Sequence, residues 1–376
     1  MVIEIAKFGV EEWLNKWEKE ARYDISQSSI AALTLKELTN LGGMTVTAFF
    51  EKLSSKELDY GWIEGSPTFK KLVAKFYQKI PTANVLQTNG STGANMLALY
   101  ALLNPGDHVV TTFPTYQQLY DIPRSLGAHV DFVRLEEAAN WQLDLEKLAA
   151  VVTPATKIIC LNNANNPTGT LLDRIALERV AAIARKADAY VVVDEVYSPL
   201  VDSDDFVSIA DVYEKGIATN SLSKTYSLPG LRIGWIASPD SEIVNLFRKY
   251  RDYTLISSGV LDDELAVLAL SNRAKILQRN QKIVIDNLEI VKKWIEKEPR
   301  VELVLPKNVP TSFIKLDIPE DDYSFCVSLL KNTGVLLVPG TAFGVPQHAR
   351  LGYCCDKKTL EQGLALLTQH LRKFDK

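Results

Sequence analysis

A lysine between a predicted strand and a glycine-containing turn is the first candidate for covalent chemistry. Lys224 follows the predicted strand 216–223 and precedes the run Gly-Leu-Arg-Ile-Gly at 230–234, which contains Arg232. The hydroxyl side chains around it are those of Ser221, Ser223 and Thr225. A covalent amine beside several anion-binding donors suits a phosphorylated aldehyde. Considered alone, the segment also fits a solvated lysine in a loop.

Polar side chains follow two other apolar strands. Asp194 and Tyr197 come directly after the run Tyr-Val-Val-Val, and Asn166 lies in Asn-Ala-Asn-Asn-Pro-Thr-Gly at 163–169. The carboxyl ends of parallel strands are where α/β proteins bind ligands. Asp194 could keep a pyridine nitrogen protonated, Tyr197 could reach the same ring, and Asn166 could donate to a phenolate oxygen. The alternatives are a helix cap and a simple turn.

The loop at 87–96 predicts an anion site. A Gly/Ser/Thr sequence that contains Ser91 and Thr92 leads into a predicted helix. Free N–H groups and the helix dipole favour an anion at such a helix start. This signal is weak when taken alone.

Alternating apolar and helical segments predict the scaffold around these residues. Nearly continuous apolar strands separated by helices favour a parallel sheet covered on both faces, and therefore an α/β fold. We expect strands at 108–113, 157–163, 190–196 and 216–223, and helices at 97–103 and 176–187.

The two ends of the chain predict a smaller α+β domain. The N-terminal part should form a helix at 10–20, with Trp13 and Trp17 on one face. A second helix, expected at 66–79 within the large domain, has Ser66 as its cap and Pro67 in its first position. The C-terminal part should hold a long helix at 287–299, strands at 301–306, 312–318 and 334–340, and a final helix at 360–373. We expect a large domain at 46–275 and a small domain built from 1–45 and 276–376.

The overall composition excludes several classes of protein. The 376 residues are 47% hydrophobic and 23% charged, which is typical of a soluble globular protein. A net charge of −4 without a basic cluster argues against nucleic-acid binding. No segment has the length of a membrane span or the pattern of a signal peptide. Four cysteines without paired spacing indicate free thiols, which predicts a cytoplasmic protein. No metal site is expected.

Together these segments resemble the class I/II aminotransferases, which are fold-type-I enzymes that use pyridoxal 5′-phosphate (PLP). The similarity covers roughly residues 55–360, and its motifs occur in the order that the family uses. It implies the PLP-dependent transferase fold, with a mostly parallel sheet between helices and a smaller α+β domain. The motifs are Tyr-Gly-Trp-Ile-Glu-Gly (60–65), Gly-Ser-Thr-Gly-Ala (90–94), Asn-Asn-Pro-Thr-Gly (165–169), Asp-Glu-Val-Tyr (194–197), Ser-Leu-Ser-Lys (221–224) and Gly-Leu-Arg-Ile-Gly-Trp (230–235).

The resemblance implies a role for each matching residue. Lys224 would hold PLP as a Schiff base and carry the proton between the substrate Cα and C4′. Asp194 would pair with the ring nitrogen, and Asn166 and Tyr197 with the ring's 3-oxygen. Arg350, in His-Ala-Arg-Leu-Gly, would bind the substrate α-carboxylate together with Asn166, because a planar guanidinium matches a carboxylate.

The phosphate and the subunit contact are implied in the same way. Tyr116 would stack on the cofactor. Tyr60 would reach the phosphate in the neighbouring subunit, which implies a homodimer with shared active sites. The phosphate would be held by Ser91, Thr92, Ser221, Ser223 and Arg232.

The expected reaction moves an amino group between an L-amino acid and a 2-keto acid. One departure from the family leaves alternatives open. The segment 22–38 is polar where the family usually has a small apolar stretch, so it is either a solvated loop with a helix cap or a lid for a polar or cationic substrate side chain. With 58–67 it is similar to the branch that contains capreomycidine synthases and PLP-dependent arginine oxidases.

That branch keeps open an oxidase, cyclase or lyase acting on arginine or another amino acid. Trp62 and Glu64 are further candidates for the specificity pocket. Arg248 and Arg251 are nominal candidates for binding an acidic side chain. A non-catalytic PLP-binding regulator is disfavoured, because Lys224 is present and no DNA-binding domain precedes the motifs.

Overall fold

A seven-stranded sheet forms the centre of the larger part of the molecule. The computed structural model describes residues 4–197, 200, 206–307 and 309–375. All strands of this sheet run in one direction except β8, which is antiparallel to both of its neighbours. In spatial order the strands are β2 (Val85–Asn89), β8 (Ile233–Ala237), β7 (Gly216–Ser221), β6 (Tyr190–Asp194), β5 (Thr156–Asn162), β3 (His108–Phe113) and β4 (His129–Arg134).

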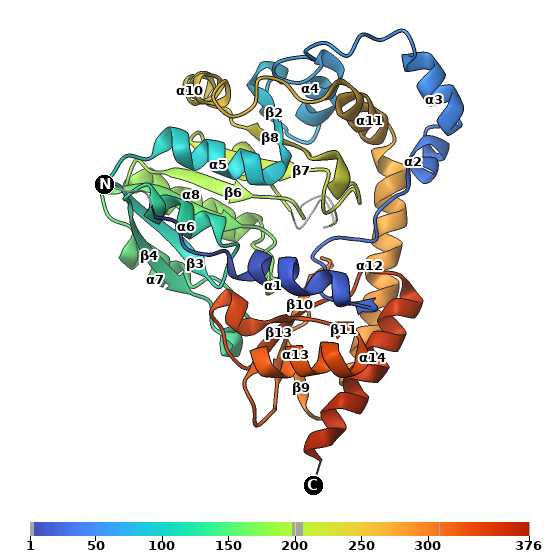
Figure 1. Ribbon diagram of the computed structural model, residues 1–376. Helices are drawn as coiled ribbons and strands as arrows, with labels where there is room; N and C mark the ends of the chain where they lie inside the picture. The colour runs from blue at the N-terminus through green and yellow to red at the C-terminus, as the bar shows by residue number, and fades with distance from the viewer. Residues whose placement is uncertain (1–3, 198–199, 201–205, 308, 376) are drawn as a thin grey trace.

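Both faces of this sheet are buried, as the apolar runs predicted. Successive side chains of a strand point to opposite faces, so Ile158 and Cys160 of β5 pack in one core and Ile159 and Leu161 in the other. Figure 1 shows the sheet between its helices. One face packs against α5 (Gly90–Leu102), α6 (Gln118–Ser125) and α10 (Ser241–Arg251); α7 (Leu145–Val151), α8 (Arg174–Lys186) and α9 (Ile209–Val212) lie on the other.

The second part of the molecule holds two smaller sheets. A four-stranded antiparallel sheet has the order β12-β13-β10-β9, and a parallel pair joins β1 to β11. The strands are β1 (Tyr23–Asp24), β9 (Val301–Leu303), β10 (Thr311–Leu316), β11 (Val335–Leu336), β12 (Val338–Pro339) and β13 (His348–Gly352). The helices beside them are α12 (Arg273–Ile295), α13 (Asp322–Thr333) and α14 (Lys357–Leu371).

The N-terminal helix lies between the two parts. In Figure 1, α1 (Gly9–Trp17) crosses the middle of the molecule above the smaller sheets. Val10, Trp13 and Trp17 form its buried stripe, and Trp13 Nε1 donates a hydrogen bond to Leu337 O at 2.8 Å. In Figure 1, α2 (Leu35–Leu41) and α3 (Val46–Leu53) lie on the right side, and α4 (Pro67–Ala74) and α11 (Val260–Ser271) lie at the top.

The predicted elements are confirmed in kind, with changes in length. The Ser66 cap and Pro67 start α4, but the helix ends at Ala74 because the next residues turn toward β2. The helix expected at 97–103 begins earlier, at Gly90, and the one expected at 287–299 is the last part of α12. The division at 275/276 stays a prediction, and α12 crosses it without a break.

The polar N-terminal segment is not the solvated loop that was one expectation for it. Ser26 is fully buried and Ser28 is nearly so, between the apolar anchors Ile25 and Ile30. The helix cap is confirmed further on, where Thr34 caps α2 in a reciprocal pair with Glu37. Within the described residues, none of the helices combines the length and apolar character of a membrane span.

Candidate active site

A cavity of about 510 Å³ opens at the carboxyl ends of β5 and β6. This is the edge of a parallel sheet at which ligands are expected. Two segments from other parts of the chain, α1 and β13, close it from the opposite side. Ten of the predicted site residues line this cavity: Ser91, Thr92, Tyr116, Asn166, Asp194, Tyr197, Ser223, Lys224, Arg232 and Arg350.

Two predicted residues lie elsewhere. Ser221 is fully buried below the cavity, and its Oγ accepts the backbone N–H of Ser223 at 3.2 Å. It therefore fixes the turn that carries Ser223 and does not line the cavity. Tyr60 is exposed on the surface and lines a separate hollow beside Val260.

Lys224 projects into the cavity from the turn after β7. Its Nζ donates a hydrogen bond to Ser28 Oγ at 2.9 Å, across 196 residues of sequence. Desolvation, followed by the positive charge of Arg350, lowers the pKa of Lys224 to about 8. Both causes disfavour the ammonium form. The amine is therefore more available as a nucleophile or base near neutral pH than an ordinary lysine.

Asp194 ends β6 as a buried carboxylate. Desolvation raises its pKa to about 6, although a hydrogen bond from Asn95 opposes the shift. Asn95 Nδ2 donates to Asp194 Oδ2 at 2.7 Å, and Thr219 Oγ1 donates to Asn95 Oδ1 at 2.6 Å. A cation placed against Asp194 would favour its ionised form. The residue is thus suited to hold a protonated ring nitrogen.

Arg350 supplies a buried positive charge at the other end of the cavity. Its Nε donates to Ser26 O at 3.0 Å, and its Nη1 donates to Asn166 Oδ1 at 3.4 Å. Within the described part of the chain these bonds use two of the five N–H donors of the guanidinium. Desolvation lowers the pKa of Arg350, but an arginine remains charged in proteins. Donors therefore remain for a substrate carboxylate.

The start of α5 and Arg232 form a cradle that fits a phosphate. Ser91 and Thr92 lie in the first turn of this 13-residue helix, where N–H groups are free to bind an anion. A Cβ on Gly90, whose φ is +65°, would lie 2.8 Å from Arg232 Nη2. A Cβ on Gly234 would lie 2.4 Å from the Gly90 backbone. Both glycines are needed for backbone and guanidinium to converge on this point.

Sequence reasoning missed one face of α1. Glu11 and Asn15 of α1 line the cavity on the side away from the buried tryptophan stripe, and Glu18, directly after the helix, continues this line. The helix is held against the large sheet by Gln117, which accepts from Gly9 N at 2.9 Å and donates to Lys7 O at 2.8 Å. The helical period could have shown that these residues share a face, but not what that face contacts.

The family is decided by comparison with known proteins. The sequence profile described as aminotransferase class I and II matches residues 36–367. The chain belongs to this family. Its fold and its cofactor are those of a PLP-dependent aminotransferase.

Three relatives illustrate the similarity. A solved PLP-dependent aminotransferase of Streptococcus suis 89-1591 is 52% identical and superimposes with a TM-score of 0.96, with 99% of each chain covered. Capreomycidine synthase of Streptomyces vinaceus is 28% identical over 96% of this chain and 93% of its own. Aspartate aminotransferase of Thermotoga maritima is 30% identical over 78% of this chain and 77% of its own.

The other specificity candidates lie outside the cavity of this aminotransferase. Glu64 is held by Lys70 at 2.5 Å and by Arg248 at 2.6 Å. Arg251 is buried and donates to Gln87 O at 2.8 Å. Trp62 is exposed. Glu64 and Arg248 thus belong to an ion-pair cluster. The geometry supports neither a specificity pocket at Trp62 and Glu64 nor the binding of an acidic side chain by Arg248 and Arg251.

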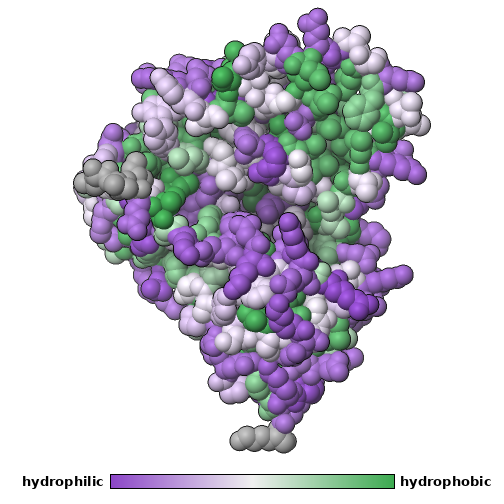
Figure 2. All heavy atoms as spheres, viewed as in Figure 1, coloured by the Kyte–Doolittle hydropathy of each residue, from purple (hydrophilic) through white to green (hydrophobic). Residues whose placement is uncertain are grey.

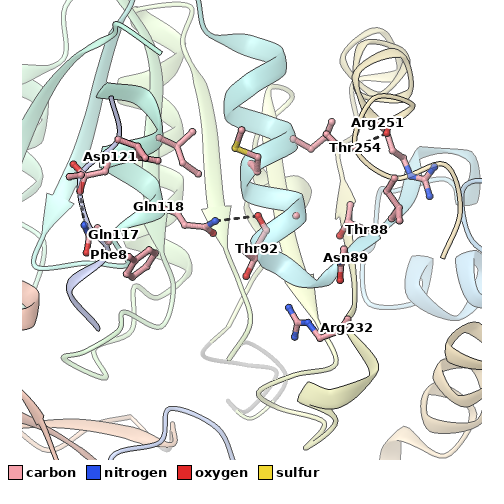
Figure 3. Close-up of a pocket in the computed structure, with 17 residues that line it drawn as sticks. Phe8, Thr88, Asn89, Thr92, Gln117, Gln118, Asp121, Arg232, Arg251 and Thr254 are labelled. Atoms are coloured by element: carbon pink, nitrogen blue, oxygen red, sulfur yellow. Dashed lines mark hydrogen bonds between the residues drawn. The ribbon is translucent and has the colours of Figure 1, made fainter. Parts of the chain in front are cut away.

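A second cavity of about 470 Å³ adjoins the candidate active site. It lies between α5 and the segment after α10, and it shares Thr92, Gln118 and Arg232 with the first cavity. Figure 3 shows Gln118 directed toward Thr92, where its Nε2 donates to the backbone oxygen at 3.4 Å, and Arg232 at the start of α5. The phosphate cradle can therefore be approached from two sides.

Proposed function

We propose that this aminotransferase transfers the amino group of an L-amino acid with a polar or cationic side chain to a 2-keto acid. One observation carries the proposal: Lys224, Asp194 and Arg350 converge on a single cavity from β7, β6 and β13. A nucleophilic amine, a ring-nitrogen partner and a carboxylate clamp are the three groups that the reaction needs.

The cavity residues divide the binding of PLP among them. Lys224 would hold its aldehyde carbon and Asp194 its ring nitrogen, with Tyr116 against the ring. Bound PLP supplies an electron sink that stabilises negative charge at the substrate Cα. The ring oxygen and the phosphate would be held by Asn166, Tyr197, Ser91, Thr92, Ser223 and Arg232, with Ser221 supporting the turn beneath.

The chain itself provides orientation and proton transfer. Arg350 and Asn166 hold the α-carboxylate, which fixes the direction of the Cα–H bond. Lys224 Nζ accepts the Cα proton, and its pKa of about 8 keeps a useful fraction unprotonated near neutral pH. Ser28, at 2.9 Å from Nζ, keeps the amine directed into the cavity.

The charges that line the cavity favour a cationic or polar substrate side chain. The cations among its described lining residues are Lys224, Arg232 and Arg350, and each has a role toward the cofactor or the α-carboxylate. Among the lining residues that the structure describes, no cation therefore remains for an acidic side chain. Glu11 of α1 and Glu18 directly after this helix instead place carboxylates on the wall of the cavity.

A matched pair of donors tests this selectivity. Arginine and citrulline have nearly the same shape, but only arginine carries a positive side chain. We expect the wild type to prefer arginine. Glu11→Gln should lose about fivefold in kcat/KM for arginine and nothing for citrulline. This factor corresponds to about 1 kcal/mol, as expected for a partly exposed charge pair. Glu12→Gln is the control, because Glu12 pairs with exposed Lys7. If Glu11→Gln lowered kcat/KM equally for arginine and citrulline, the proposed recognition of the positive side chain by Glu11 would be refuted.

A second chemistry on the same cofactor is the alternative. It is favoured by the similarity to capreomycidine synthase along 96% of this chain. Transamination requires a 2-keto acid for a second turnover, whereas an oxidase consumes oxygen and a cyclase or lyase needs neither. Turnover measured without keto acid, with and without oxygen, separates these cases.

We also propose that two copies form a homodimer with shared active sites. The segment 58–63 carries large apolar side chains more than half exposed, and Gly61 packs against Ser258 and Val260 of the neighbouring segment. Figure 2 shows hydrophobic side chains gathered over the area of α3 and α11. The exposed residues include Leu58, Tyr60, Trp62, Ile63, Tyr253 and Ile256. A partner's Tyr60 would approach the phosphate cradle through the second cavity.

Mixed dimers test this sharing. Lys224→Ala and Tyr60→Phe each damage both sites of a homodimer. When the two variants are mixed and exchange subunits, one site receives Lys224 from one copy and Tyr60 from the other. Recovery of activity above both parents supports the proposal, and a monomer in sedimentation or no recovery after proven exchange would refute it. The cytoplasmic location stays a prediction.

A further inference from the structure

Three side chains that can bind a metal ion meet at an edge of the large sheet. His108 is the first residue of β3, and His129 and Asp131 lie on the edge strand β4. In the parallel pairing His108 lies opposite His129. Residues two apart on a strand point to the same face, so Asp131 joins the two histidines there. One ligand atom of each residue lies within 4.8 Å of the others.

The carboxylate of Asp131 already bridges the two imidazoles. Its Oδ2 lies 3.2 Å from His108 Nε2, and its Oδ1 lies 3.2 Å from His129 Nε2. Two ligand atoms in a tetrahedral site with bonds of about 2.0 to 2.1 Å are about 3.4 Å apart. The separations within the cluster therefore already approach those around a metal ion.

A neighbouring hydroxyl can hold His108 in the form that a metal requires. His108 Nδ1 lies 2.9 Å from Thr156 Oγ1. When Nδ1–H donates to this oxygen, Nε2 keeps its lone pair for a ligand, and metal-binding histidines usually have such a partner. The side chains of His129 and Asp131 are 71% and 47% exposed, so water can complete the coordination.

We propose that His108, His129 and Asp131 form a binding site for a divalent ion of the zinc type. Two imidazole nitrogens and one carboxylate oxygen suit Zn²⁺, Co²⁺ or Ni²⁺. The site lies at the starts of parallel strands, whereas the cavity with Lys224 lies at the carboxyl ends. An ion here would join the edge strand to its neighbour and takes no part in amino transfer.

Titration of the PLP-loaded enzyme tests the proposal. Zn²⁺ binding is followed by calorimetry at neutral pH, and Co²⁺ binding by visible absorption. We expect one ion per chain and a higher melting temperature with Zn²⁺, because the ion binds only the folded state. His129→Gln and Asp131→Asn each remove one ligand, so both should bind Zn²⁺ at least about tenfold more weakly and lose the shift.

A third variant controls for the loss of a histidine. His370 of α14 contacts Ser328 of α13, far from this cluster in the sequence and on other elements, so His370→Gln should bind Zn²⁺ as wild type does. Unchanged PLP content and transaminase activity verify that the ligand variants fold. Loss of binding in both ligand variants and not in the control supports the site. Absence of one-to-one binding in wild type, or equal binding in Asp131→Asn, would overturn it.

Discussion

Asn95 offers a sharp test of how the fold tunes the cofactor site. Its Nδ2 donates to Asp194 Oδ2 at 2.7 Å, and both side chains are buried. Replacing Asn95 with alanine removes this hydrogen bond to the buried carboxylate of Asp194. The alanine side chain has no donor that could replace it. A hydrogen bond to a charged group contributes about 1.5 to 3 kcal/mol, so Asn95→Ala should weaken the hold on the ring nitrogen by this amount.

The magnitude can be expressed in two measurable quantities. About 1.4 kcal/mol corresponds to one pKa unit and to a factor of ten, so the pKa of Asp194 in the PLP-free chain should rise by about one to two units from its value of about 6. We expect kcat/KM to fall about 10- to 100-fold. Thr219→Val loses the bond that orients Asn95, at 2.6 Å, together with a longer contact to Val193 O at 3.5 Å, and should show a smaller effect in the same direction.

The assay separates this positioning role from general destabilisation. We would measure kcat, KM, the PLP dissociation constant and the melting temperature for each variant. Asn287→Ala is the matched control, because Asn287 is also buried and donates to the backbone oxygens of Tyr353 and Cys355. It should lower stability without changing PLP affinity. Wild-type catalysis and PLP affinity in Asn95→Ala, at equal loss of stability, would refute the reasoning.

Three further predictions concern titration and the cofactor. The rate of PLP capture by the PLP-free protein should be half-maximal near pH 8, the pKa of Lys224, and Glu11→Gln should move this midpoint to lower pH because Glu11 raises that pKa; a midpoint that stays or rises contradicts the geometry. Buried Glu195, whose pKa is raised by desolvation from 4.5 to about 8, binds a proton in the folded state that the unfolded chain has lost, so the free energy of unfolding should fall as pH rises between these values, by at most about 1.4 kcal/mol per pH unit. Glu195→Gln should remove this pH dependence of the free energy of unfolding, measured by urea unfolding of the PLP-free protein. The same pH dependence in wild type and in Glu195→Gln would argue against this role of Glu195. Removal of PLP should lower the melting temperature, since PLP binds only the folded state, and equal curves would count against a tightly held cofactor.

Much of the scaffold could be predicted because its signals are local. The strands β3, β5, β6 and β7 each contain a short apolar run, and polar residues follow each run. Asp194 and Lys224 could be placed for that reason, since the carboxyl ends of parallel strands meet at one edge. Their family motifs then supplied roles that spacing alone left open.

The missed residues depend on contacts between distant parts of the chain. Ser28 meets Lys224 across 196 residues, and Asn95 meets Asp194 across 99. Glu64 was a candidate for the specificity pocket because it lies in a motif, but its carboxylate pairs with Arg248 at 2.6 Å outside the cavity. The sequence predicted the strand β3 but neither β4 nor its pairing with β3, and this pairing brings His108 and His129 together.

The position of α1 also sets the order in which the enzyme is assembled during translation. Trp13 binds Leu337 and Ser26 binds Arg350, and each hydrogen bond spans 324 residues. At about 5 to 20 residues per second, the ribosome needs roughly 16 to 65 seconds to make the chain between such partners. The last strand of the large sheet along the chain, β8, ends at Ala237. The strands beside the phosphate cradle are therefore made well before Leu337 and Arg350. The wall formed by α1, to which we assign substrate selection, is therefore completed last, and on this proposal a nascent chain holds the elements of its cofactor site before it can discriminate between amino acids.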